Sequence, residues 1–531
     1  MKQFDVLQST AQLLRARGLT VVFGNPGSNE LPFLAGLGDD FDFVLGLHEQ
    51  VVVGMAEGYS RATGEPVLVN LHAASGSGNA MGALTNARYG NVPLVILAGQ
   101  QVRETVGQES MLANIDAGAL TRPLTKFSHE PLAASDVPRA LSQAIFEAAS
   151  EPRGPVYVSV PLDDWAQPAH PDDALLLERS VQQVGELPDA LADQLASVLD
   201  AAERPALVVG PQIDAAAAAD PRVWSALIRL AEHTDASVYV APSPTRGVFP
   251  TAHPNFAGVL VPGIRSVHER LSGHDAVLVA GAPVFRYHRW EPGSYLPEGT
   301  ELWQITQDPS EAARAPFGRA VIGDAGSAVR VLADRVRDRG TRRPARTLPP
   351  ARTSEQGMTG TEILEVLNAN VRDDVVYVNE TTTLDLDYLE RIDISQPNRY
   401  HFPASGGLGF GLPAAVGFAL GQPGATVVAT VGDGSANYGI TALYTAAQRG
   451  TRTIFVIVNN SGYGALAGFA QRMGVPDVPG LDLGGIDFVK IAEGYGVPAC
   501  LADSREDFER AYREALQAEG PVLIEARIVN G

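Results

Sequence analysis

Two polar residues that follow neighbouring apolar runs carry the strongest chemical signal in the sequence. Asp433 comes just after the run 426–431, and Asn460 comes just after the run 453–458. Between them, residues 437–449 show apolar residues at helical spacing, so the segment predicts one strand–helix–strand unit. Because the crossover in such a unit is right-handed and its strands are parallel, Asp433 and Asn460 should meet at the carboxyl edge of one sheet.

The oxygen atoms expected at this edge suit a magnesium ion. The Asp433 carboxylate, the Asn460 amide and the backbone carbonyl of Gly462 are ligands that Mg²⁺ accepts when a diphosphate supplies the remaining oxygens. Gly432 and Gly434 would let backbone N–H groups approach that phosphate, and the helix N-terminus that follows adds a favourable field. Gly-Asp-Gly is also a common turn in which the aspartate caps a helix, so the motif alone leaves both interpretations open.

The elements that must position these residues recur along the chain. Short apolar runs bounded by Gly, Pro or Asn lie at 20–28, 66–75, 93–99 and 154–161, and a second series lies at 206–211, 237–242, 276–283 and 301–306. Strands that alternate with helical stretches predict α/β layers with parallel sheets. We expect three α/β domains, at residues 1–180, 181–340 and 341–531. The Arg- and Pro-rich segment 337–356 lacks apolar periodicity and is predicted to be a solvated linker.

The first and third domains repeat one outline. Residues 76–97 and 432–457 each contain a glycine-rich turn, a helix, a glycine and a buried strand. Each domain later closes on a Gly-Pro-Val strand, at 153–160 and 519–526. The pattern predicts two related outer domains around a middle one, with chance similarity between α/β units as the alternative.

Composition excludes several classes of partner. The 531 residues contain 40 Lys and Arg against 61 Asp and Glu, and the net charge of −21 repels nucleic acid and anionic membrane surfaces. The longest clean apolar run, 92–99, is far shorter than the about 18 residues that span a bilayer. The single cysteine, Cys500, excludes an intrachain disulfide and a multi-cysteine metal site. The opening 20 residues predict an amphipathic helix rather than a signal peptide, so we expect a cytoplasmic protein.

The motif around Asp433 resembles that of a known superfamily. GDGS at 432–435, with Asn459-Asn460 after the next strand, is similar to the diphosphate-binding motif of thiamin-diphosphate enzymes of the decarboxylase and acetolactate synthase superfamily. Residues 48–66 resemble its glutamate-bearing turn. The resemblance implies thiamin diphosphate and Mg²⁺ as cofactors, with Glu49 hydrogen-bonded to the aminopyrimidine ring. It also implies a cofactor between domains of different subunits, hence at least a dimer, and we expect a homotetramer built as a dimer of dimers.

Further positions match cofactor contacts of that superfamily. Leu408 corresponds to the bulky residue that lies under the bent cofactor, although core packing is the ordinary role of a leucine. The cofactor-binding residues implied by the resemblance are Asn25, Pro26, Gly27, Thr382, Thr383, Gly406, Leu408, Gly432, Gly434, Ser435 and Tyr463, and the metal ligands are Asp433, Asn460 and Gly462.

Five stretches resemble the benzoylformate decarboxylases through nearly the whole length of the chain. They are 23–34, 71–84, 281–288, 406–415 and 432–438. The resemblance implies that Ser28 binds the substrate carboxylate, that His72 both donates and accepts protons, and that His288 is a proton donor. Taken singly, a serine in a turn or a histidine at a strand end more often has no catalytic role.

An apolar lining is expected to select the substrate. The positions that match the pocket are Met111, Leu112, Phe402, Ala465, Leu466 and Phe469, which would together suit an aryl group. The pair Ala467-Gly468 is smaller than the resemblance implies, which could shift the preference. Since a thiazolium acts as an electron sink for the loss of CO₂, we expect non-oxidative decarboxylation of an aromatic 2-oxo acid such as benzoylformate to the aldehyde and CO₂.

Several alternatives stay open. Acetolactate synthase shares the cofactor but would be expected to lack His72 and His288, and other 2-oxo acid decarboxylases carry a His-His pair that this chain lacks. Carboligation of the benzaldehyde lyase type could accompany decarboxylation. A nicotinamide-dependent dehydrogenase could be argued from GSGNAMG at 76–82, although its glycine spacing is wrong. A scaffold without activity would have no chemical need for Glu49, Asp433 and Asn460 together.

Overall fold

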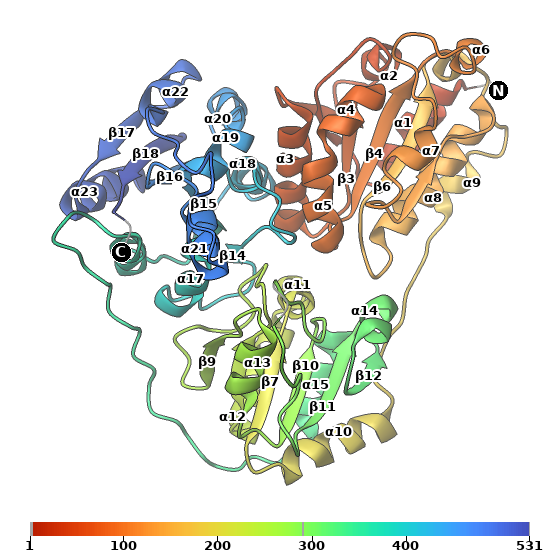
Figure 1. The fold of residues 1–531 in the computed structure, drawn as a ribbon. Coiled ribbons are helices and arrows are strands. Elements are labelled where there is room, and N and C mark those ends of the chain that lie inside the picture. The colour runs from red at the N-terminus through yellow and green to blue at the C-terminus, as the bar shows by residue number, and fades with distance from the viewer. Residues whose placement is uncertain (1–3, 289–290, 530–531) are drawn as a thin grey trace.

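Three six-stranded parallel sheets follow one another along the chain in the computed structural model, which describes residues 4–288 and 291–529 (Figure 1). The first sheet contains β1 (Val21–Gly24), β2 (Asp42–Leu45), β3 (Val67–Leu71), β4 (Leu94–Gln100), β5 (Phe127–His129) and β6 (Val156–Pro161). The middle sheet contains β7 (Pro205–Val209), β8 (Ser237–Val240), β9 (Phe256–Val259), β10 (Ala276–Ala280), β11 (Glu301–Thr306) and β12 (Arg319–Ile322). The third contains β13 (Val375–Glu380), β14 (Tyr400–His401), β15 (Thr426–Gly432), β16 (Thr453–Asn459), β17 (Ala499–Ala502) and β18 (Val522–Arg527). The predicted three-domain α/β fold is confirmed.

The outer domains share one topology, which supports the predicted relation between them. Their strand orders, β2-β1-β3-β4-β6-β5 and β14-β13-β15-β16-β18-β17, follow the same pattern, while the middle sheet runs β12-β11-β10-β7-β8-β9. In both outer domains the predicted glycine-rich turn is helical, as α4 (Ala73–Asn79) followed by α5 (Met81–Tyr89), and as α19 (Asp433–Gly439) followed by α20 (Ala442–Arg449). The prediction of one helix over 437–449 was therefore wrong. Tighter backbone bonds, from Leu443 N to the Ile440 carbonyl and from Tyr444 N to the Thr441 carbonyl, interrupt it.

Two central helices join the outer domains. Helix α3 (Glu49–Thr63) of the first domain packs along α18 (Gly411–Gly421) of the third, and Figure 1 shows them side by side. A Cβ atom on Gly58 would lie 2.0 Å from the Ala414 carbonyl oxygen, and one on Gly417 would lie 1.8 Å from that of Met55. Glycine is therefore required at both positions for this close approach. The contact fixes the start of α3, where Glu49 lies, relative to the third domain.

The segments between domains contain no regular elements. Residues 179–188 separate α9 (Leu175–Glu178) from α10 (Asp189–Ala201), and residues 336–359 separate α15 (Ala325–Arg335) from α16 (Gly360–Ala369). The predicted boundaries at 180 and 340 fall within these two segments.

The second linker is solvated, as predicted, since none of residues 337–356 is buried, but its arginines bind the domains it passes. Arg343 donates to Asp235 at 2.7 Å, Arg346 to the Thr251 carbonyl at 2.9 Å, and Arg352 pairs with Asp387 at 2.8 Å. The guanidinium groups that suggested a solvated segment thus fix its path. Within residues 4–288 and 291–529, no helix has the length and apolar character needed to cross a membrane.

Candidate active site

The Glu49 carboxylate is one of the buried acids of the first domain. It lies at the first position of α3 and is 7% exposed. Its Oε1 accepts a hydrogen bond from Asn25 Nδ2 at 3.2 Å, and its Oε2 accepts one from Asn79 Nδ2 at 3.0 Å. Because Asn25 follows β1 and Asn79 ends α4, both amides fix the carboxylate at the carboxyl edge of the first sheet.

The predicted proton-transfer residue His72 lies at the same edge. It follows β3, and its Nδ1 is 2.8 Å from Glu30 Oε2. Ser28, in the turn after β1, is exposed, with its Oγ 3.4 Å from Asn29 Oδ1. Asn25, Pro26 and Gly27 form the start of that turn, and Pro26 is also exposed. The first-domain candidates are therefore brought together, with the serine and the histidine at the accessible side.

Asp433 and the loop that contains Asn460 also meet, as the topology predicts. Strands β15 and β16 are paired, with Gly432 opposite Val458. Asp433 is 3% exposed, and its Oδ2 accepts the Gly462 N–H at 2.9 Å. Burial raises the pKa of Asp433, while the N–H groups of Gly434 and Gly462 act in the opposite direction.

The oxygen donors here fit a magnesium ion that shares its coordination with a ligand. Asn460 Nδ2 lies 2.5 Å from where a Cβ on Gly464 would be, so the amide is at this loop. The Gly462 carbonyl accepts the Gly464 N–H at 3.0 Å and keeps a second lone pair. Among the described residues, no group of three or more His, Cys, Asp and Glu side chains could hold a metal by itself. One carboxylate, one amide and one carbonyl leave positions around an octahedral Mg²⁺ that phosphate oxygens and water would fill.

Tyrosine and small residues line the same edge. The Tyr463 ring packs on Gly434, with its Cε1 2.6 Å from where a Cβ would be, and Ser435 is buried. A hydrogen bond with Tyr438 raises the pKa of Tyr463. Thr382 and Thr383 are exposed after β13, and Thr383 Cγ2 lies 3.2 Å from the Cβ position of Gly464. The third-domain cofactor candidates thus surround one loop edge.

The loop that contains Leu408 is held from both sides. Glu380, at the end of β13, accepts the Gly409 N–H on Oε1 and the Gly411 N–H on Oε2, both at 2.7 Å. The Leu408 carbonyl accepts Gln50 Nε2 at 2.7 Å. Burial raises the pKa of Glu380 to about 7, and the N–H donors oppose that shift. Leu408 is therefore fixed beside the start of α3. Gly406, two residues earlier, has a φ of +74°.

His288 reaches the third domain from the middle one. Its ring meets Phe469 edge-on, with centroids 4.9 Å apart and an interplanar angle of 82°. Phe469 lies on α21 (Gly464–Met473), and the Arg472 guanidinium lies 4.5 Å from the centre of its ring. A titratable imidazole and an aromatic surface are thus in direct contact across a domain boundary.

The remaining pocket candidates divide between two places. Met111 is 84% exposed, and the Leu112 carbonyl accepts Asn29 Nδ2 at 3.3 Å, which places this segment beside Ser28. Ala465 and Leu466 begin α21, and Leu466 is 52% exposed. Within one chain, the apolar candidates near Ser28 and those on α21 are therefore separate groups.

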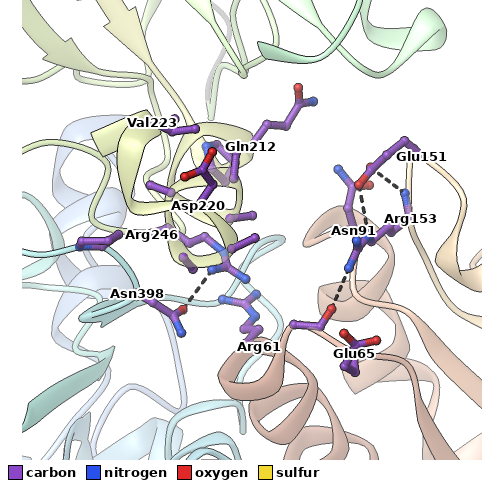
Figure 2. A pocket seen from close by; sticks show the side chains of 18 of the residues that line it. Arg61, Glu65, Asn91, Glu151, Arg153, Gln212, Asp220, Val223, Arg246 and Asn398 are labelled. Atoms are coloured by element: carbon purple, nitrogen blue, oxygen red, sulfur yellow. Dashed lines mark hydrogen bonds and ion pairs between the residues drawn. The ribbon is translucent and has the colours of Figure 1, made fainter. Parts of the chain in front are cut away.

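Phe402 lies at a third place, the junction of all three domains. A cavity of about 1180 Å³ opens there, lined by Arg61, Arg246 and Asn398 among others (Figure 2). Arg61 pairs with Glu57 at 2.7 Å and donates to the Phe402 carbonyl at 3.3 Å, and Arg246 donates to Asn398 Oδ1 at 3.1 Å. None of the four catalytic candidates is among the described residues that line the cavity. The guanidinium groups of Arg61 and Arg246 in the cavity wall hold the segment 398–402 in place through these hydrogen bonds.

Three site residues escaped the sequence analysis. Glu30, Gln50 and Asn79 each contact a candidate, and all three lie in stretches quoted for the resemblance, at 23–34, 48–66 and 71–84, without having been assigned a role. The sequence did not indicate a role for Asn79 because residues 76–82 were predicted to form a turn. In the structure Asn79 is the last residue of α4, and α5 begins at Met81. This helical geometry also removes the dehydrogenase alternative, which needs a phosphate-binding loop there.

The chain matches three family descriptions in succession. Residues 4–120 match the N-terminal TPP binding domain of thiamine pyrophosphate enzymes, residues 192–332 match their central domain, and residues 383–526 match their C-terminal TPP binding domain. Benzoylformate decarboxylase of Pseudomonas aeruginosa is 51% identical over 98% of each chain. A putative acetolactate synthase large subunit of Mycobacterium tuberculosis is 30% identical over 96% of each chain.

Solved structures agree with these relatives. The 4-hydroxybenzoylformate decarboxylase of Rhodococcus jostii has a TM-score of 0.97 and 51% identity, over 99% of this chain and 100% of its own. Benzoylformate decarboxylase of Polynucleobacter necessarius has a TM-score of 0.94 and 37% identity, over 100% and 99%. With its three domains in this order and relatives along its whole length, the chain belongs to the thiamine pyrophosphate enzyme family.

Proposed function

We propose that this protein decarboxylates an aromatic 2-oxo acid, benzoylformate or a ring-substituted relative, to the aldehyde and CO₂. The observation that carries the proposal is the edge contact between His288 and Phe469, in which an imidazole that could donate a proton lies against an aromatic ring. Relatives of 51% identity named benzoylformate and 4-hydroxybenzoylformate decarboxylase support the substrate class. His72 and His288, which an acetolactate synthase is expected to lack, are both present in this chain.

The third domain would hold the metal and the diphosphate. We assign Mg²⁺ to Asp433, Asn460 and the Gly462 carbonyl, whose donor set needs phosphate oxygens to complete it. Leu408 would support the bent cofactor, and Glu49 would hold its aminopyrimidine ring. When bound, thiamin diphosphate supplies the electron sink that makes loss of CO₂ possible.

The protein's own side chains would then orient the substrate and move protons. Ser28, exposed in the turn after β1, binds the substrate carboxylate through its hydroxyl. His72 and His288 donate and accept protons, and each such role is worth about 10²–10⁴ in rate. Phe469 supports the aryl group, and Leu466, Met111 and Leu112 exclude water from it.

Two copies of the chain would complete each site. The Glu49 carboxylate is hydrogen-bonded to amides of its own domain, and the pocket candidates form separate groups within one chain. Met111 at 84% and Leu466 at 52% exposure are the apolar side chains that a second copy would cover. We infer a homo-oligomer with sites between first and third domains of different copies, assembled as a tetramer.

Product identity tests this function. Purified protein with thiamin diphosphate and Mg²⁺ is given benzoylformate, 4-hydroxybenzoylformate or pyruvate, and the products are separated by chromatography. We expect aromatic aldehyde and equimolar CO₂ from the aryl substrates. Acetolactate from pyruvate as the main product would favour the synthase alternative instead, and product formation without added cofactor in stripped protein would contradict the cofactor assignment.

A further inference from the structure

Glu30 is a buried carboxylate with no role in the proposed function so far, and it contacts one of the proposed proton-transfer residues. We propose that Glu30 is a positioning residue that holds the Nδ1–H of His72 and leaves Nε2 as the only nitrogen that exchanges protons with the substrate. The inference rests on the role proposed for His72 and deepens it.

The Glu30 carboxylate is surrounded by donors. The side chain is 1% exposed, and its Oε2 lies 2.8 Å from His72 Nδ1 and accepts the Gly27 N–H at 3.1 Å. Its Oε1 accepts the Ala73 N–H at 3.3 Å. Because an ionised carboxylate only accepts hydrogen bonds, the short contact requires the proton to be on Nδ1.

Close packing keeps the ring and the carboxylate in this position. A Cβ atom on Gly27 would lie 2.1 Å from His72 Nδ1, and one on Gly99 would lie 2.0 Å from Glu30 Oε1. Glycine at both positions therefore leaves room for the pair. Ala73, whose N–H bonds Glu30, has a φ of 43°, an uncommon conformation for a residue with a side chain. The carboxylate thus contacts both the backbone N–H of the strained residue Ala73 and the ring of His72.

The exposure of the two partners sets their roles. The His72 side chain is 18% exposed against 1% for Glu30, so the imidazole alone can meet a ligand. With Nδ1 engaged, a proton reaches or leaves the ring at Nε2, and no other bond changes in this step. A carboxylate at the second nitrogen fixes the tautomer and the orientation of the imidazole ring.

Kinetics of Glu30→Gln test this role through His72. We expect kcat for benzoylformate to fall about 10- to 100-fold with little change in KM, and the pH profile of kcat to shift. In a His72→Ala background the same substitution should have almost no further effect, because Glu30 acts through the ring. A full additional loss in the double variant would overturn the inference.

A second readout does not depend on activity. In protein labelled with ¹⁵N in the histidine rings and loaded with cofactor, the His72 signals are assigned by their loss in His72→Ala. They should show the proton of the neutral ring on Nδ1 in the wild type and a larger share of the Nε2–H form in Glu30→Gln. A wild-type ring with its proton on Nε2 overturns the inference even if the decarboxylase proposal holds, and the expected pattern supports it even if benzoylformate is not the substrate.

A matched control separates this effect from the loss of any buried carboxylate. Asp164, also in the first domain and with a side chain 1% exposed, pairs with Arg103 at 2.6 Å. Asp164→Asn should lower thermal stability without changing the position of the proton on the His72 ring or the pH profile of kcat. Cofactor binding and thermal melting confirm folding of each variant, and Glu30→Asp, which keeps the charge, should retain more of the pH profile than Glu30→Gln.

Discussion

Replacement of Glu49 by glutamine tests whether its carboxylate does chemistry or only supports the fold. Glu49 accepts one hydrogen bond on each oxygen, from Asn25 and Asn79. Glutamine keeps one acceptor and presents an amide N–H₂ to the other donor, so at most one of these hydrogen bonds is lost. The structural cost is about 1–3 kcal/mol.

The catalytic cost should exceed this value. If the carboxylate takes part in proton transfer, kcat should fall about 10²- to 10⁴-fold, or about 3–5 kcal/mol in the barrier. We expect this fall at saturating cofactor, with cofactor affinity reduced less than about tenfold. Turnover by continuous aldehyde assay and cofactor binding by isothermal titration calorimetry measure the two effects separately.

A control variant keeps the carboxylate and removes one donor. Asn79→Ala loses the hydrogen bond to Oε2 and should reduce kcat less than about tenfold, because Glu49 itself is intact. If Glu49→Gln kept more than a tenth of wild-type kcat, or if Asn79→Ala fell as far as Glu49→Gln, the assignment of proton transfer to this carboxylate would be refuted.

Three other substitutions have defined outcomes. Asp433→Ala removes the buried carboxylate proposed to bind Mg²⁺. It should weaken cofactor binding at least about tenfold and abolish its dependence on Mg²⁺, and a cofactor titration unchanged by the substitution contradicts the metal site. His288→Ala should lower kcat about 10²- to 10⁴-fold for benzoylformate while cofactor affinity stays constant, and unimpaired turnover would exclude the proton-donor role. The folded-state pKa of Glu380 is about 7, above its ordinary value of 4.5, so this group stabilises the fold below pH 4.5 and loses that contribution as the pH rises through 7. Chemical denaturation should show that the free energy of unfolding of the wild type falls by about 3 kcal/mol between pH 4.5 and 7 relative to that of Glu380→Gln. If the unfolding free energies of the two proteins changed in parallel with pH, the raised pKa of Glu380 would be excluded.

Buried central strands were readily predicted from the sequence. The runs at 93–99, 426–431 and 453–458 are continuous and apolar because both faces of a parallel strand are covered, and they form β4, β15 and β16. Edge strands such as β12 and β17 have four residues each and are partly exposed, so they are too short for a periodicity to mark them. The topology that brings Asp433 to the loop of Asn460 followed from strand order alone.

Contacts between distant segments could not be predicted in this way. Nothing in the spacing of residues shows that Glu30 reaches the histidine after β3, or that Asn79 points at Glu49. These contacts depend on side-chain direction and on close packing at glycines. His288 and Phe469 were each assigned through the family resemblance, but their contact depends on how the middle domain packs against the third.

The ratio of kcat/KM for benzoylformate to that for pyruvate tests the central claim most directly. Both are measured on one preparation with thiamin diphosphate and Mg²⁺, by the rate of CO₂ release. Burial of a phenyl group against Phe469 in place of a methyl is worth about 1.5–3 kcal/mol, so the account predicts a ratio of about 10 to 150 or more. A ratio near or below one would contradict an aromatic substrate pocket, whatever the cofactor.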